Sequence, residues 1–98
     1  AANDESLVPA NTLFAKHGYM PTPETIDHLR GMGTDRVLVC GIQTDTCVLA
    51  AGFALFDAGL CPTLITDLTV GSSLDRAGQL GISLWKHHFR HTTTAREA

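Results

Sequence analysis

The sequence has little that would suit a membrane or a nucleic acid. None of its apolar stretches approaches the roughly 18 residues that a membrane-spanning helix needs. Its start, AANDESLVPA, lacks the charged and apolar regions of a signal peptide. It has no basic run, and its net charge is −3. These absences argue against nucleic acid or an anionic membrane as the main partner, and they predict a cytoplasmic protein.

The cysteines are few and do not form recognisable pairs. Cys40, Cys47 and Cys61 are an odd number, and no two of them make a C-x-x-C motif. This favours neither a disulfide framework nor a zinc knuckle. Histidines cluster in HHFRH (87–91), but no carboxylate or cysteine stands at ligand spacing beside them. We therefore expect free thiols, no metal site and no cofactor.

The first half of the chain predicts two strands and a helix. NTLFAKH (11–17) is expected as a short strand that ends in charged residues. Thr22 is a candidate helix cap with Pro23 at the first helical position, and glycines at 31 and 33 mark the helix end. RVLVCGI (36–42) is a continuous apolar, β-branched run, which is typical of a central parallel strand buried on both faces.

The second half predicts a helix, a strand, a helix and an edge strand. Thr44 or Asp45 is expected to cap a helix over 44–59, and PTLITDL (62–68) reads as a second buried strand. Ser73 is expected to cap the next helix, which carries Leu74, Ala77, Leu80, Leu84 and Trp85 and ends near HHF. RHTTT (90–94) is expected as a last edge strand.

Alternation of strands and helices predicts an α/β protein with a mostly parallel sheet. In such sheets, reactive groups lie beyond the carboxyl ends of the strands. Lys16 and residues 43–47 both fall at those predicted ends. We therefore expect them to face one crevice.

Cys47 stands where a thiol would be activated. A thiol attacks carbonyl carbons as the thiolate, and a free cysteine, with a pKa of about 8.5, is mostly protonated at neutral pH. A helix N-terminus and a nearby Lys16 ammonium would stabilise the thiolate. The alternative is a small core residue, because cysteine is among the most buried residue types. Cys40 and Cys61 lack the helix-start position and read as structural.

The stretch GIQTDTCVLAAGFALFDAGL, followed by TLITDLTVGSS, resembles the isochorismatase-like cysteine hydrolases, which include nicotinamidases and N-carbamoylsarcosine amidases. FAKHGYM upstream is similar to the family's strand-end lysine followed by a tyrosine-containing turn. The matching signature residues are Gly41, Ile42, Thr44, Asp45, Cys47 and Val48, then Asp57, Ala58, Gly59 and Asp67.

The resemblance implies a fold, a three-layer, Rossmann-like sandwich, and it implies a hydrolytic reaction at Cys47. Cys47 would be the nucleophile, and Lys16 would stabilise and position its thiolate. A cis peptide bond is expected at Ile42–Gln43, and the backbone N–H groups of Gln43 and Cys47 would form an oxyanion hole. The implied substrate is a small amide or ureido compound, hydrolysed through a thioester, with Tyr19 as a candidate residue of its pocket.

The chain also departs from the family pattern. The family's catalytic Asp lies near the end of a first strand, and nothing before Asn11 resembles that segment. The family's first two strands and the metal-binding Asp and His residues of nicotinamidases have no counterpart either. We expect residues 1–98 to be a single domain or the C-terminal part of a larger one. We also expect either a homo-oligomer or association with the missing N-terminal segment. The alternative is a non-catalytic relative that acts in oligomerisation or ligand binding.

Overall fold

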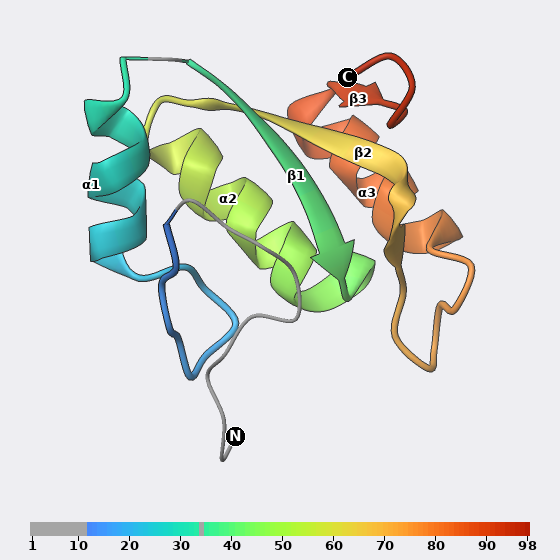
Figure 1. Ribbon diagram of the computed structural model, residues 1–98. Helices are drawn as coiled ribbons and strands as arrows, with labels where there is room; N and C mark the ends of the chain where they lie inside the picture. The colour runs from blue at the N-terminus through green and yellow to red at the C-terminus, as the bar shows by residue number, and fades with distance from the viewer. Residues whose placement is uncertain (1–11, 34) are drawn as a thin grey trace.

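A computed structural model describes residues 12–33 and 35–98 (Figure 1). In order, its elements are α1 (Pro23–Gly31), β1 (Arg36–Ile42), the π-helical turn η1 (Thr44–Val48), α2 (Leu49–Asp57), β2 (Cys61–Val70), α3 (Gln79–Phe89) and β3 (Thr92–Thr93). The three strands form one sheet in the order β1-β2-β3, and both strand pairs are parallel. This confirms the predicted α/β class with a parallel sheet.

Strand β2 is the centre of the described sheet because it pairs with both other strands. Arg36 of β1 lies opposite Cys61, and the pairing runs in register until Val39 meets Leu64. Beyond that point the register shifts, and Gly41 lies opposite Thr69. The first half of β2 is buried and its second half is more open, so the predicted buried strand is confirmed for residues 62–65.

The core lies between the sheet and helices α2 and α3, which pack side by side on β2 (Figure 1). Its buried members are Val48, Leu64, Trp85 and Phe89, and Val39, Leu49 and Ile82 pack against them. The Trp85 indole is fully buried, and its Nε1–H donates to the His91 carbonyl oxygen at 2.9 Å. The polar end of this large side chain is therefore satisfied inside the core.

The prediction that β1 is buried on both faces is wrong for the described chain. Burial alternates along the strand, with Leu38 43% exposed and Ile42 69% exposed, while Val39 packs into the core. The reason is that β1 is an outer strand of this sheet, and α2 and α3 cover only one of its faces. An apolar surface is left on the other face.

Helix α1 starts where the local signals place it. The Thr22 hydroxyl accepts a hydrogen bond from Thr25 N–H at 3.3 Å, and Pro23 occupies the first helical position. No residue of α1 is buried, and in Figure 1 it lies on the opposite side of the molecule from α3. The strand expected over 11–17 is wrong for residues 12–17, which pair with no strand, and Asn11 lies outside the described residues.

Helix α3 begins five residues later than a cap at Ser73 would place it, because Gly78 occupies the cap position. Residues 73–77 form turns and a bend, and Leu74 is 95% exposed rather than part of a helix face. Gly78, at φ 73°, precedes the helix, and the Asp75 carboxylate accepts from Leu80 N–H at 3.2 Å and from Gly81 N–H at 2.8 Å. Asp75 therefore does the capping expected of Ser73, while the predicted edge strand is confirmed at β3.

Within the residues that the structure describes, no helix is long and apolar enough to cross a membrane.

Candidate functional site

Cys47 lies in the turn that follows the carboxyl end of β1. Gly41, at φ 114°, is in a region of backbone conformation that glycine enters much more readily than other residues. The Ile42–Gln43 peptide bond is cis, as the family resemblance implies. The thiol of Cys47 is half-buried, whereas Cys40 on β1 is exposed. The free thiol thus lies at the sheet edge where the sequence predicts the site.

The turn itself is closed by hydrogen bonds to Gln43. The Gln43 carbonyl oxygen accepts from Thr46 N–H and from Val48 N–H, both at 3.1 Å. The Thr46 hydroxyl also donates to the side-chain oxygen of Gln43 at 3.3 Å. The bond from Val48 N–H spans five residues, which gives the first turn a wider, π-helical form, and α2 continues from it at Leu49.

Neither Thr44 nor Asp45 caps the helix, which corrects the sequence prediction. Gln43 occupies the cap position and makes no side-chain capping bond. Thr44 is fully buried, and its hydroxyl lies 2.6 Å from that of Thr69 on β2. Both side chains of the Thr-Asp pair reach β2 or the loop after it, because the turn packs directly against that end of the strand.

Asp45 binds Ser72 twice. Its carboxylate accepts from the Ser72 hydroxyl at 2.6 Å and from Ser72 N–H at 2.8 Å. The hydrogen bond from the Ser72 hydroxyl, followed by that from the Ser72 backbone, holds the pKa of Asp45 below its ordinary value of 3.8. Ser72 was not singled out by sequence reasoning. The signals that could have found it were its place in the stretch TLITDLTVGSS, which carries the resemblance, and among the polar residues that follow a buried strand.

The structure does not bring Lys16 to Cys47. The Lys16 ammonium donates to the carbonyl oxygens of Gly18 at 2.7 Å and Tyr19 at 3.0 Å, within its own turn. The Phe14 ring of the same segment contacts His28 of α1 with a centroid distance of 5.3 Å. Accordingly, the segment lies below α1 in Figure 1, apart from the arrowhead of β1. Tyr19 is 69% exposed.

Two hollows lie at opposite ends of the sheet. One of about 290 Å³ follows the carboxyl end of β2 and is lined by Val70, Gly71, Ser72, Ser73 and Arg76. It contains the residue that Asp45 binds, so it shares the sheet edge of Cys47.

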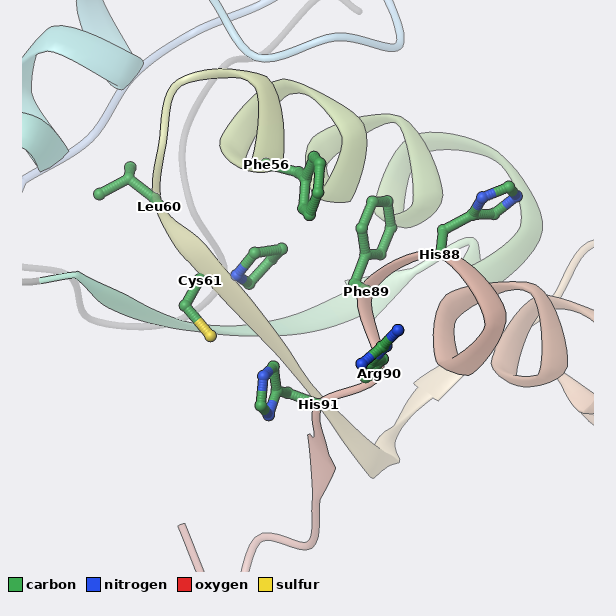
Figure 2. A pocket seen from close by; sticks show the side chains of 8 residues that line it. Phe56, Leu60, Cys61, His88, Phe89, Arg90 and His91 are labelled. Carbon is green, nitrogen blue, oxygen red and sulfur yellow. The ribbon is translucent and has the colours of Figure 1, made fainter.

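The other hollow, of about 340 Å³, lies where β2 begins, between the ends of α2 and α3 (Figure 2). Phe56 and Phe89 line it together with His88, Arg90 and His91. Cationic side chains at a helix C-terminus are favoured by its free carbonyl groups, which accounts for this cluster. In the part of the chain that the structure describes, no group of three side chains is placed to hold a metal ion.

Comparison with known families agrees with this geometry. The model of the isochorismatase domain matches residues 3–97. The chain therefore belongs to the isochorismatase domain family. A comparison with curated proteins gives no match.

Three solved structures show the same fold. An isochorismatase family protein from Desulfovibrio vulgaris is 20% identical with a TM-score of 0.77 over 90% of this chain and 48% of its own. The pyrazinamidase/nicotinamidase of Streptococcus mutans is 20% identical with a TM-score of 0.69 over 80% of this chain and 44% of its own. An isochorismatase-like hydrolase from Alkaliphilus metalliredigens is 17% identical with a TM-score of 0.67, and the match covers 76% of this chain and 40% of that protein. The chain thus spans less than half the length of each of these three proteins.

Proposed function

We propose that this chain carries the nucleophile of a cysteine-dependent hydrolase that cleaves a C–N bond, amide or ureido, of a small molecule. The observation that supports it best is the position of Cys47, in the turn between β1 and α2 at the carboxyl end of the sheet. One of the similar structures is named a pyrazinamidase/nicotinamidase, which favours an amide as the bond class.

The reaction would run in two halves. The Cys47 thiolate attacks the carbonyl carbon, the C–N bond breaks, and the amine leaves after taking up a proton. Water then attacks the thioester, which releases the acid and restores the thiol. The backbone N–H groups of Gln43 and Cys47 would bind the oxyanion, and one such donor typically stabilises the transition state by about 3 kcal/mol.

The roles proposed for Lys16 and Tyr19 require a change in the segment that carries them. All of residues 12–20 are exposed, and the Lys16 ammonium is held by carbonyl groups of its own turn. For Lys16 to stabilise the Cys47 thiolate, this segment has to move toward the end of β1. The same movement would bring Tyr19 to the edge of the substrate pocket.

The catalytic Asp would come from further chain of the same domain. The similar structures are more than twice as long as the part that this chain matches in them. Leu38 and Ile42 leave an apolar surface on β1, and no described strand pairs with the outer edge of β1. An uncovered apolar strand at a sheet edge invites another strand to pair with it. We therefore propose that an N-terminal segment of the domain covers β1.

Brief labelling with iodoacetamide near pH 7, followed by peptide mass spectrometry, tests the nucleophile. In the chain as described, exposure alone would favour Cys40, which is exposed, whereas Cys47 and Cys61 are half-buried. The proposal expects Cys47 to react fastest, because an activated thiolate outweighs access. In the whole protein, where the segment of Lys16 is proposed to reach the end of β1, the Lys16→Ala variant should slow the labelling of Cys47 and leave that of Cys40 unchanged.

Cys40 labelling faster than Cys47, or negligible labelling of Cys47, would contradict this proposal. A role in oligomerisation or ligand binding without catalysis would then be the better account. The Cys47→Ala variant of the whole protein gives the second test. It should abolish amidase activity and acyl-enzyme formation, and retained activity would exclude Cys47 as the nucleophile.

A further inference from the structure

The nucleophile turn is held from outside by residues that are distant in sequence. Asp45 stands two residues before Cys47, and its carboxylate accepts both hydrogen bonds that Ser72 can offer, from the hydroxyl and from the backbone N–H. The two residues are 27 positions apart. The contact therefore ties the turn after β1 to the loop after β2.

The neighbouring contacts leave the turn little freedom in other directions. Thr44 is fully buried against Thr69. On the other side, a Cβ at Gly81 of α3 would lie 2.8 Å from Thr44 Cγ2 and 3.1 Å from Asp45 N. The helix and β2 thus enclose Thr44, and the Asp45–Ser72 pair closes the exposed side of the turn.

From these contacts we infer that Asp45 is a positioning residue for Cys47, acting through its paired hydrogen bonds to Ser72. This inference rests on the proposed role of Cys47 as nucleophile. Asp45 does not touch the thiol; it fixes the backbone that carries the thiol and the proposed N–H donors. A reacting group misplaced by an ångström loses much of its rate, so a rigid turn has a direct chemical value.

Positioning of the turn by Asp45 can be distinguished from an effect of its negative charge on the Cys47 thiolate. A negative carboxylate two residues from a thiolate disfavours that thiolate, so removing the charge alone should not slow the thiol. An asparagine can keep both contacts while losing the charge: its side-chain oxygen accepts from Ser72 N–H, and its amide donates to the Ser72 hydroxyl oxygen. The Asp45→Asn variant should therefore restore what Asp45→Ala loses.

The test compares Asp45→Ala, Asp45→Asn and Ser72→Ala in the whole protein, with Asp67→Asn as the matched control. Asp67 also lies near the end of β2, and its carboxylate accepts from Ala95 N–H at 2.8 Å, away from the turn. The first readout is hydrogen–deuterium exchange of residues 43–48. Asp45→Ala and Ser72→Ala should both speed this exchange, while Asp45→Asn and Asp67→Asn should leave it near the parent rate.

The second readout is the rate at which iodoacetamide labels Cys47. Asp45→Ala should slow it by about tenfold, because a loosened turn no longer holds the backbone N–H groups at the helix start toward the thiolate, and less of the thiol is then ionised. The double variant with Ser72→Ala should be no slower, because both changes break the same contact.

Unchanged exchange of residues 43–48 in Asp45→Ala overturns the inference, and so does the same loss of labelling in Asp67→Asn. Slow Cys47 labelling in the parent would contradict the nucleophile proposal instead, and the exchange data would still decide whether Asp45 holds the turn.

Discussion

The hydroxyl groups of Thr44 and Thr69 lie 2.6 Å apart, at the point where the turn after β1 meets β2. Thr44 is fully buried, so water cannot replace Thr69 as the hydrogen-bond partner of its hydroxyl. The pair joins the family signature around Cys47 to the second strand. It is the innermost of the contacts that hold the candidate site together.

Replacing Thr44 with valine tests how much the Thr44–Thr69 hydrogen bond contributes to the free energy of unfolding. The shape of the side chain is kept, but the hydroxyl of Thr69 loses its partner. We expect the free energy of unfolding to fall by about 1–2 kcal/mol, measured by urea denaturation. Adding Thr69→Val should recover part of the loss, because no unpaired hydroxyl then remains. A double variant that loses the sum of both single effects would show that the hydrogen bond does not couple the residues.

Two glycines in helices offer a matched test of packing. A Cβ at Gly52 of α2 would lie 2.5 Å from Phe89 Cε2 and 2.7 Å from Trp85 Cζ3, whereas one at Gly31 of α1 would meet nothing within 4 Å. Gly52→Ala should therefore destabilise the protein by about 1–3 kcal/mol through overpacking. Gly31→Ala should be neutral or stabilise by up to about 1 kcal/mol. Equal thermal midpoints for the two variants would contradict this account of the core.

The apolar surface of β1 can be probed at Leu38. A substitution at a true surface position usually changes stability by no more than about 0.5 kcal/mol. If further chain covers β1, Leu38→Lys instead buries a charge without a partner and should cost about 2 kcal/mol or more in the whole protein. Leu74→Lys is the control, because Leu74 is 95% exposed.

Equal stability of the Leu38 and Leu74 variants would mean that β1 stays uncovered. A change in oligomeric state by sedimentation, caused by Leu38→Lys alone, would assign the surface to a second copy of the chain.

The Asp45–Ser72 contact predicts a specific dependence on pH. Because the pKa of folded Asp45 lies below 3.8, the ionised carboxylate stabilises the folded state. That contribution is present above pH 3.8 and is lost as the pH falls through the lower, folded value. The urea midpoint of the parent should therefore drop more between pH 5 and pH 3 than that of Asp45→Asn. Parallel declines in the two proteins would show that the charge of Asp45 contributes nothing.

Local sequence signals placed several elements correctly. Thr22 and Pro23 fix the start of α1 by capping chemistry that needs only neighbouring residues. The run RVLVCGI coincides with β1, and the buried half of β2 lies within PTLITDL. These predictions hold because propensity and burial pattern act over a few residues.

The candidate site was predictable in part. The signature around Cys47 placed the thiol at the carboxyl end of β1, and the cis bond at Ile42–Gln43 was expected there. The partners of Thr44 and Asp45 were not, since they lie 25 and 27 residues away. Nothing local distinguishes a cap residue from one that binds a distant loop.

The sequence by itself determined the α/β alternation, the apolar strands and the membership in the isochorismatase domain family, because each depends on local pattern. The tertiary structure alone decided which carboxylate caps α3, which face of β1 is covered, and what Asp45 binds. It also left the Lys16 ammonium bonded to carbonyl groups of its own turn, in a segment whose Phe14 contacts His28 of α1. These features depend on which distant segments meet, and that is set by the packing of α2 and α3 on the sheet and by the chain available to cover its other face.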